Sequence, residues 1–357
     1  MKIHPDHPVE CLIYTRREDG SCQCGVCPRR CIIHEGSRGF CRGRKNIDGT
    51  LYALNYGRIL SMAVSPIEKK PLFHFYPGSM WISMGTFGCN FRCHGCQNWS
   101  MSHADGGGVL VSASEVVEYA RRFDCLGISW TYNEPSVWLE FIFDSARKAK
   151  ENGLLTHLVT NGYITPDALD TIGPYIDCFR VDIKGFSEET YTRIAGIKDF
   201  SAILEATKRA KFRWEMHVEC VTNIIPGYND SEIELNQIAS WISKELGRET
   251  PWHVTRFFPQ FRLSGWMATE IQTLKKAIQI GKESGLLYVY MGNVYDGSDT
   301  ICPSCGSILI GRDGFLIKRY NLSGNRCTFC GFVVSGRFPE RYGSDYRLWK
   351  GYEIPLI

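Results

Sequence analysis

The sequence lacks several features that would assign it to a common class of protein. None of its uninterrupted apolar stretches approaches the roughly 18 to 20 residues that a transmembrane helix needs. The first ten residues lack the apolar region of a secretory signal, so we expect a cytoplasmic protein. An excess of one charge is also missing, because 41 Lys and Arg against 38 Asp and Glu give a net charge of +3. This balance supports neither nucleic acid nor an anionic membrane as a partner.

Cysteine is the residue that the sequence has in excess, with 16 among 357 residues. A reducing cytosol disfavours disulfides, and the clustered spacing of these cysteines indicates metal ligation instead. Cys125, Cys178 and Cys220 stand apart from the clusters. We expect these three to be buried as small apolar side chains.

Hydrophobic patterning predicts three segments: an N-terminal four-cysteine metal-binding extension over 1–75, alternating strands and helices over 76–297, and a C-terminal four-cysteine ribbon and tail over 298–357. Strands are expected at 80–86, 126–131, 154–160, 178–183, 213–222, 252–257 and 286–291. Helices are expected at 112–122, 135–152, 165–172, between 187 and 210, at 230–246 and at 269–284. Repeated strand–helix units imply parallel strands with right-handed crossovers. No Gly-x-Gly-x-x-Gly fingerprint follows any of these strands, which disfavours a dinucleotide-binding sheet. We therefore predict an α/β fold, a partial (β/α)6 TIM-like barrel, with function at the C-terminal strand ends.

The central cysteine cluster, Cys89-Asn-Phe-Arg-Cys93-His-Gly-Cys96, directly follows the first core strand. Three thiolates cannot complete a tetrahedral metal site alone, but they suit an iron–sulfur cube in which one iron has no protein ligand. Such an open position is where a substrate or cofactor binds. The alternative is a zinc site completed by His94 or His103.

This triplet, placed after the first strand of a parallel α/β fold, resembles that of the radical S-adenosylmethionine (SAM) superfamily. Further motifs match the branch similar to pyruvate formate-lyase activating enzyme: Gly88 to Trp99, Thr131-Tyr-Asn-Glu-Pro135, Val159-Thr-Asn-Gly162, Val181-Asp-Ile-Lys-Gly185 and Ile225-Pro-Gly-Tyr-Asn-Asp230. The N-terminal Cys-x2-Cys-Pro-x2-Cys, Pro66 to Pro71 and Pro251 to Arg256 are similar to the radical SAM enzyme of the AmmeMemoRadiSam system. The resemblance covers roughly residues 20 to 335.

The resemblance implies an anaerobic oxidoreductase with a [4Fe-4S] cluster on Cys89, Cys93 and Cys96. SAM would chelate the open iron and be cleaved reductively to methionine and a 5′-deoxyadenosyl radical, which takes hydrogen from an unidentified substrate. The electron would come from an external one-electron donor similar to flavodoxin or ferredoxin. The substrate would be a small molecule or a polypeptide, with proteins of the AmmeMemo system as candidate partners.

The resemblance assigns roles to motif residues at the ends of the second and third strands. Asn133 and Glu134 lie where the superfamily places the motif that holds the SAM ammonium group. A buried carboxylate needs a cation partner, although Glu134 could instead cap the following helix. Thr160 and Asn161 would hydrogen-bond the SAM ribose or carboxylate, or form an ordinary Asn-Gly turn.

The next strand ends supply further cofactor-binding candidates. Asp182 and Lys184 share one face by alternation, which places Lys184 for the SAM carboxylate and Asp182 for a cation or hydroxyl. Their alternative is an internal ion pair. Ile225 would pack against the adenine or belong to the core. The backbone of Gly95 would face the adenine, without the aromatic ring that the superfamily often has at this position.

Four positions are weaker candidates for substrate contact, and one is a departure from the family pattern. His253 and Arg256 alternate on the sixth strand, where one could face the substrate. Lys69 and Lys70 are expected in a solvated turn. Val159 stands where the activating-enzyme branch often has Asp, which weakens the case for a cation shared with Asp182.

The flanking clusters each offer four thiolates. Two Cys-x2-Cys-Gly knuckles predict a closed tetrahedral site on a small β ribbon, holding structural zinc or a rubredoxin-like iron, on Cys302, Cys305, Cys327 and Cys330. The N-terminal set would hold zinc or an auxiliary iron–sulfur cluster, with Cys22 as a competing ligand, on Cys24, Cys27, Cys31 and Cys41. Nothing in that segment besides the thiols suggests electron transfer, which favours zinc slightly.

Three functions follow as hypotheses. The first is hydrogen abstraction from an unidentified substrate by a radical SAM enzyme. The second is activation of a partner enzyme by making a glycyl radical, as pyruvate formate-lyase activating enzyme does. The third is a non-catalytic, metal-stabilised binding module, against which the intact triplet and Glu134, Asp182 and Lys184 argue.

Overall fold

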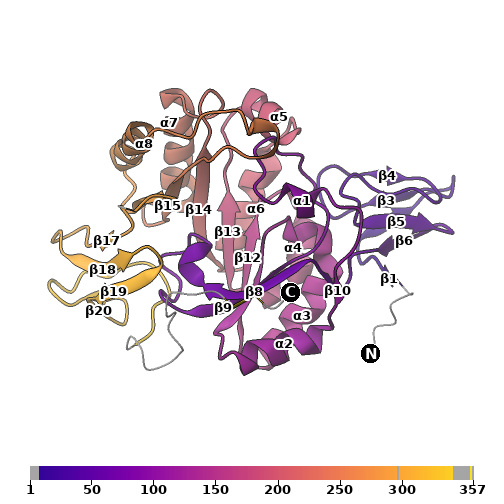
Figure 1. The fold of residues 1–357 in the computed structure, drawn as a ribbon, viewed down its shortest axis with the longest axis horizontal. Coiled ribbons are helices and arrows are strands. Elements are labelled where there is room, and N and C mark those ends of the chain that lie inside the picture. The colour runs from indigo at the N-terminus through magenta and orange to yellow at the C-terminus, as the bar shows by residue number, and fades with distance from the viewer. Residues whose placement is uncertain (1–7, 296, 341–353, 356–357) are drawn as a thin grey trace.

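The computed structural model describes residues 8–295, 297–340 and 354–355, so parts of the predicted N-terminal extension and C-terminal tail lie outside the described residues. Its central feature is a nine-stranded sheet in the order β16-β15-β14-β13-β12-β11-β9-β8-β22 (Figure 1). The strands are β8 (Ser61–Pro66), β9 (Met80–Gly85), β11 (Gly127–Trp130), β12 (Leu155–Thr160), β13 (Cys178–Asp182), β14 (His217–Ile224), β15 (Trp252–Arg256), β16 (Val289–Gly292) and β22 (Ile354–Pro355).

Seven neighbouring strands of this sheet, β9 and β11 to β16, are parallel. Strand β8 pairs antiparallel with β9, and β22 pairs antiparallel with β8. Every residue of β9 is buried, as expected for a strand covered on both faces. The predicted parallel α/β arrangement is confirmed, with six crossovers leading to a seventh strand. The curvature of a partial barrel stays a prediction.

Helices make the crossovers, and local sequence sets their ends. A capping box of Ser112 and Glu115 begins α2, Thr165 caps α4, and Ser187 caps α5, which ends at the left-handed Gly196. The helices are α1 (Trp99–Ser102), α2 (Ala113–Arg122), α3 (Leu139–Glu151), α4 (Pro166–Ile172), α5 (Glu188–Ala195), α6 (Ser201–Phe212), α7 (Glu232–Trp241) and α8 (Ile271–Glu283). No helix within the described ranges is both long and apolar enough to cross a membrane.

Three predicted boundaries differ from the structure. The helix expected over 135–152 begins as a 3-10 turn, η2 (Pro135–Trp138), and becomes α-helical from Leu139. The helix expected over 230–246 ends in a π-helical turn, η4 (Ile242–Leu246). The strand expected from 213 starts at His217, because α6 continues to Phe212.

Small sheets flank the central one on opposite sides (Figure 1). The N-terminal side carries β1 (Val9–Glu10), β2 (Tyr14–Arg16), β3 (Cys22–Cys24), β4 (Ile32–Ile33), β5 (Arg44–Ile47) and β6 (Thr50–Ala53). The C-terminal ribbon carries β17 (Thr300–Ile301), β18 (Ile308–Asp313), β19 (Leu316–Tyr320), β20 (Leu322–Ser323) and β21 (Arg326–Cys327). Short pieces complete the fold: β7 (Arg58–Ile59), β10 (Val109–Leu110), η1 (Ile67–Lys69), η3 (Gly173–Tyr175) and η5 (Phe261–Leu263).

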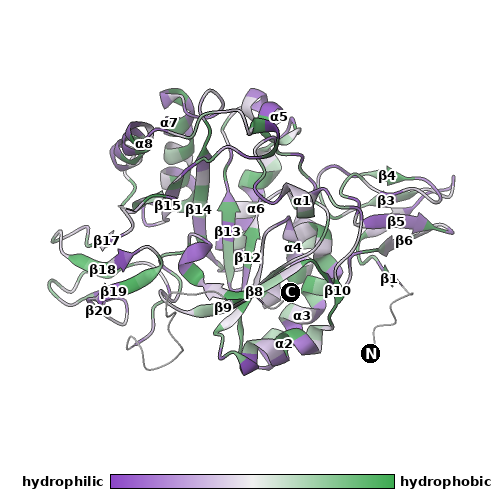
Figure 2. Ribbon diagram, in the orientation of Figure 1, coloured by the Kyte–Doolittle hydropathy of each residue, from purple (hydrophilic) through white to green (hydrophobic). Residues whose placement is uncertain are grey.

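The main core lies between the central sheet and its helices. Hydrophobic residues concentrate in β12 and β13, whereas α2 and α8 carry hydrophilic stretches as well (Figure 2). A second apolar cluster joins the ribbon to the central sheet, and it contains Phe73, Tyr288 and Tyr290 together with Leu309 and Ile310. The isolated Cys125, Cys178 and Cys220 are buried, as expected.

Candidate metal and cofactor site

A cavity of about 740 Å³ opens where the parallel strands end. Ligands of α/β sheets bind at this carboxyl edge because the loops there converge from successive strands. All eleven residues predicted for the central cluster and cofactor line this one cavity: Cys89, Cys93, Gly95, Cys96, Asn133, Glu134, Thr160, Asn161, Asp182, Lys184 and Ile225. The structure therefore brings together side chains that lie up to 136 positions apart in the sequence.

The three central thiols sit on the loop between β9 and α1. Gly88 precedes them with a φ of +90°, and a Cβ there would lie 2.3 Å from the Cys41 carbonyl oxygen, so only glycine fits. The three sulfur atoms do not gather within 4.8 Å of one another, as they would around a single ion. Burial raises the pKa of Cys93 to about 11, although Lys184 acts in the opposite direction. A bound metal must therefore displace the thiol proton.

Glu134 is a buried carboxylate at the cavity wall, 2% exposed. Its Oε1 accepts hydrogen bonds from Thr160 Oγ1 at 2.8 Å and from the Ser136 N–H at 2.9 Å, and its Oε2 accepts one from the Asn161 N–H at 2.7 Å. Burial raises the pKa of Glu134. The side chain caps η2, which confirms the predicted alternative, and it also lines the cavity, where its contact with SAM stays a prediction. All its partners are neutral donors, which leaves a lone pair of Oε2 for a cation.

Two asparagines fasten the cysteine loop to neighbouring strands. Asn133 accepts a hydrogen bond from the Thr86 N–H at 3.1 Å and donates one to the Gly88 carbonyl at 2.8 Å. Asn161 donates to Asn90 Oδ1 at 2.9 Å. These side-chain amides therefore position the loop. Asn161 also lines the cavity, and its predicted contact with SAM stays a prediction.

Asn90 is a candidate positioning residue that the sequence did not single out. It is fully buried beside Cys89 and donates to the Tyr163 carbonyl at 2.8 Å and to Ser136 Oγ at 3.3 Å. Its side chain thus links the cysteine loop to the loops after β11 and β12. Its place inside the Cys89 motif was the one signal in the sequence.

Asp182 lies between two cations on one face of β13 and its extension. Lys184 Nζ lies 3.0 Å from Asp182 Oδ2, and Arg180 pairs with the other carboxylate oxygen. Although burial raises the pKa of Asp182, Arg180 and Lys184 outweigh this effect and lower it. The ion pair given as the alternative for Asp182 and Lys184 is present. Arg180 contacts the second carboxylate oxygen of Asp182, which a cation held jointly by Asp182 and an acidic residue at position 159 would otherwise use.

The aromatic ring missing at Gly95 is replaced from another strand. A Cβ at Gly95 would lie 2.8 Å from the Phe257 ring, and Phe257 also lines the cavity. Phe257 follows β15, 162 positions along the chain. The aromatic ring of Phe257 therefore lies beside Gly95, the residue before the third cysteine, although the cysteine motif itself has no aromatic residue there.

Behind the cavity wall, a buried acid lies between two histidines. Glu219 accepts hydrogen bonds from His253 Nε2 at 2.6 Å and His217 Nε2 at 2.9 Å. His253 lines the cavity, and its Nδ1 has no partner among the described residues. Because Nε2–H is held by Glu219, Nδ1 of the neutral ring is an acceptor. Arg256 does not line the cavity; its Nε donates to the Thr269 carbonyl.

Lys70 corrects the expectation of a solvated turn. It lines the same cavity and is 5% exposed, and its Nζ donates to Ser65 Oγ. Lys69 is exposed, as expected.

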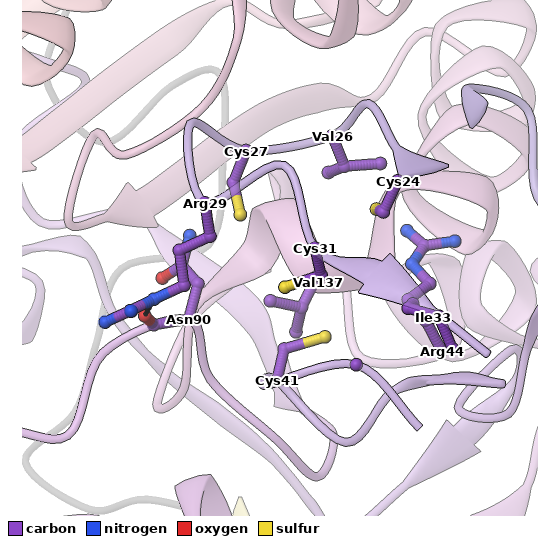
Figure 3. A pocket seen from close by; sticks show the side chains of 11 residues that line it. Cys24, Val26, Cys27, Arg29, Cys31, Ile33, Cys41, Arg44, Asn90 and Val137 are labelled. Carbon is purple, nitrogen blue, oxygen red and sulfur yellow. Dashed lines mark hydrogen bonds between the residues drawn. The ribbon is translucent and has the colours of Figure 1, made fainter. Parts of the chain in front are cut away.

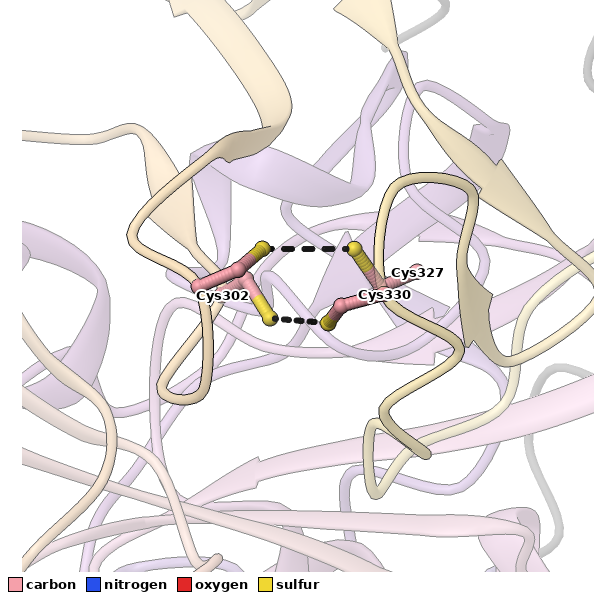
Figure 4. Close-up of side chains that lie close together, drawn as sticks. Cys302, Cys327 and Cys330 are labelled. Carbon is pink, nitrogen blue, oxygen red and sulfur yellow. Dashed lines mark hydrogen bonds between the residues drawn. The ribbon is translucent and has the colours of Figure 1, made fainter.

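The C-terminal cysteines form a compact group. Cys302 and Cys330 sulfurs lie 3.6 Å apart, and those of Cys305 and Cys327 lie 3.8 Å apart (Figure 4). Four sulfurs bound at about 2.3 Å to one tetrahedral ion are separated by about 3.8 Å. The predicted four-cysteine site is therefore present with the spacing of a mononuclear metal. The ribbon also meets the large cavity, which Gly314 and Phe315 line from the β18–β19 turn.

The N-terminal cysteines surround a separate space. A cavity of about 20 Å³ is lined by all four predicted ligands, Cys24, Cys27, Cys31 and Cys41. The competing Cys22 lies elsewhere, with its sulfur 3.3 Å from the Gly49 carbonyl oxygen.

Comparisons with known proteins show what this chain is similar to. The model of the radical SAM superfamily matches residues 84–242. An uncharacterized protein of Methanocaldococcus jannaschii is 43% identical over 329 residues, covering 90% of this chain and 97% of that protein. Pyruvate formate-lyase-activating enzyme of Clostridium pasteurianum is 28% identical over 43% of this chain and 66% of that enzyme. A radical SAM methyltransferase structure from Sphaerobacter thermophilus has a TM-score of 0.48 and 16% identity, covering 65% of this chain and 71% of that chain.

Proposed function

Because the chain belongs to the radical SAM superfamily, we propose that it is an enzyme that abstracts hydrogen from a substrate in the 740 Å³ cavity. A [4Fe-4S] cluster on Cys89, Cys93 and Cys96 would supply the electron that cleaves SAM to methionine and a 5′-deoxyadenosyl radical. The donor set fits this cluster, because three partly buried thiols line one cavity without gathering around a single ion.

The observation that carries the proposal is the environment of Glu134. This carboxylate is buried at the cavity wall, and all its hydrogen-bond donors are neutral groups. A buried anion is stabilised when a cation completes its surroundings. The ammonium group of SAM would supply that cation at the edge of the cavity where the three thiols lie.

The other residues of the cavity would orient the cofactor and receive the substrate. Lys184 would hold the SAM carboxylate while keeping its contact with Asp182. Asn133 and Asn90 would keep the cysteine loop in place against the strand ends. The substrate would then lie toward His253, with the ribbon's Phe315 as part of its wall.

Product analysis tests the proposal directly. Protein reconstituted without oxygen and mixed with SAM and dithionite should yield 5′-deoxyadenosine and methionine. Replacing Cys89, Cys93 and Cys96 together by Ala should abolish the product, whereas the control Cys125→Ala, outside both cavities, should retain it. Product from the triple variant would refute the assignment.

Glycyl-radical activation is a second candidate, favoured by the 28% identity to the Clostridium pasteurianum activating enzyme. That similarity covers 43% of the chain, which is too short a stretch to include both the N-terminal and the C-terminal cysteine sites. Mixing the reduced protein and SAM with pyruvate formate-lyase should produce a glycyl-radical resonance in the electron paramagnetic spectrum. Formation of 5′-deoxyadenosine without that resonance would favour the first candidate.

A further inference from the structure

The four N-terminal thiols meet around one enclosed space although they come from separate pieces of chain. Cys24 ends β3, Cys27 and Cys31 lie on the loop that leads to β4, and Cys41 precedes β5. Figure 3 shows the sulfur atoms of Cys27, Cys31 and Cys41 turned toward a common space, with Cys24 at its edge. Apolar side chains complete the lining, among them Val26, Ile33 and Val137.

The spacing of these sulfur atoms differs from that of the C-terminal site. No three of them lie within 4.8 Å of one another, whereas all four C-terminal sulfurs do. One zinc ion bound to four thiolates would draw the sulfurs to about 3.8 Å and leave no cavity among them. A cube spreads its ligands, because each thiolate binds a different iron at a corner. The central triplet shows the same open spacing.

We propose that Cys24, Cys27, Cys31 and Cys41 hold an auxiliary [4Fe-4S] cluster. The sequence alone favoured zinc slightly, and the open spacing reverses that preference. Four thiolates provide a ligand for each of the four irons, so this cluster has no iron free to bind SAM.

A buried cation at the cavity wall supports an anionic occupant. Arg44 lines the cavity and is 1% exposed. Its Nη1 binds Glu140 at 2.6 Å and Cys11 at 2.8 Å, but its Nη2 has no hydrogen-bond partner among the described residues. A buried N–H donor without an acceptor is costly. The sulfur atoms of a four-thiolate cluster, which carries net negative charge, would be its acceptors.

The auxiliary site directly adjoins the proposed SAM cluster. The Cys41 carbonyl packs against Gly88, the residue before Cys89. Arg92 donates to the Cys89 carbonyl at 2.7 Å and to the Phe40 carbonyl at 2.6 Å, which joins the two cysteine loops. Asn90, next to Cys89, lines the N-terminal cavity.

This proximity gives the auxiliary cluster a role that rests on the proposed function. An external one-electron donor similar to flavodoxin is oxidised by one electron, which enters the auxiliary cluster and moves on to the cluster on Cys89, Cys93 and Cys96. There it is consumed in breaking the S–C5′ bond of SAM. The auxiliary cluster returns to its starting oxidation state in each cycle.

Metal analysis of the variant in which Cys89, Cys93 and Cys96 are all Ala tests the assignment. Purified without oxygen, it should retain about four irons with visible charge-transfer absorption, in addition to the single C-terminal metal. At most one iron, whether with two zincs or with none, overturns the proposal. If wild type and the triple variant each contain about four irons, the auxiliary cluster is supported. The proposed cluster on Cys89, Cys93 and Cys96, and the function that depends on it, would then be refuted.

Cys41→Ser in the otherwise native protein tests the relay, with Cys22→Ala as the matched control from outside the cavity. Retention of the C-terminal metal reports that each variant is folded. We expect Cys41→Ser to form 5′-deoxyadenosine at least tenfold more slowly with reduced flavodoxin and at a near-native rate with dithionite. Equal slowing with both reductants, or no slowing with either, overturns the relay.

Discussion

Replacing Glu134 by Gln should weaken SAM binding without removing iron. The substitution keeps the size of the side chain and removes its charge. The remaining Gln oxygen can still accept from Thr160 and the Ser136 N–H, now 2.8 and 2.9 Å from Oε1. Its amino group would face the Asn161 N–H, which now donates to Oε2 at 2.7 Å, so one hydrogen bond is lost. The cysteine loop keeps its own fastenings through Asn133 and Asn90.

The expected loss follows from one charge-assisted contact. Such a contact contributes about 1.5 to 3 kcal/mol, which corresponds to a roughly 10- to 150-fold increase in the dissociation constant of SAM. Equilibrium dialysis of SAM against anaerobically reconstituted protein measures this constant, and iron analysis of the same sample reports the cluster. Native affinity with native iron content would refute the ammonium contact.

Glu234→Gln provides the matched control for this experiment. Glu234 is also a buried carboxylate that accepts from a backbone N–H, that of Phe186, and from the hydroxyl of Thr190. It does not line the cavity. Its replacement should lower the free energy of unfolding by about 1 to 3 kcal/mol and leave the affinity for SAM unchanged. A similar loss of affinity in both variants would mean that destabilisation, rather than a lost contact, weakens binding.

The pH dependence of SAM binding provides an independent check. Burial raises the pKa of Glu134 above its usual value, and only the ionised form attracts the ammonium group. As the pH falls through this raised pKa, Glu134 takes up a proton and affinity should fall. The loss should therefore begin at a higher pH than a surface glutamate would give. Glu134→Gln lacks the titrating group, so its affinity should not show this component.

Three further predictions concern the neighbouring sites. Lys184→Ala should raise the dissociation constant of SAM roughly tenfold or more with iron retained, and unchanged affinity in dialysis would contradict the carboxylate contact. Gly88→Ala should lower the iron content, because its Cβ would meet the Cys41 carbonyl at 2.3 Å, whereas the control Gly106→Ala, with no atom within 4 Å, should keep native iron. Cys327→Ser should release one metal equivalent from the ribbon, measured by mass spectrometry of the metals, and loss of four irons instead would contradict a mononuclear site.

Much of the fold follows from local patterns in the sequence. The fully buried run of β9 and the Ser-x-x-Glu box at Ser112 each specify an element through neighbouring residues. Cysteine spacing likewise marks the three thiol sites, because ligands of one metal tend to lie on one short loop or two knuckles. These signals are local, so a single sequence carries them.

Other features depend on contacts between distant loops, which no local pattern records. Asn90 contacts Asn161 across 71 positions, and Glu219 binds the Phe73 N–H across 146. Lys70 is buried with its ammonium group on Ser65 Oγ and the Pro66 carbonyl, although the adjacent Lys69 is exposed. Phe257 occupies the space beside Gly95 although the two belong to different strand ends.

Two kinds of residue line the cavity, and this difference explains why the sequence indicates a reaction and leaves the substrate open. Glu134 and Lys184, which would meet the cofactor, belong to motifs that resemble the wider activating-enzyme branch. Lys70 and His253 lie in the narrower motifs Pro66 to Pro71 and Pro251 to Arg256, and Phe315 belongs to the ribbon. Cofactor binding constrains a fixed set of groups and so leaves a recurring pattern. The substrate must therefore be sought by varying Lys70, His253 and Phe315 rather than the residues that would hold the cofactor.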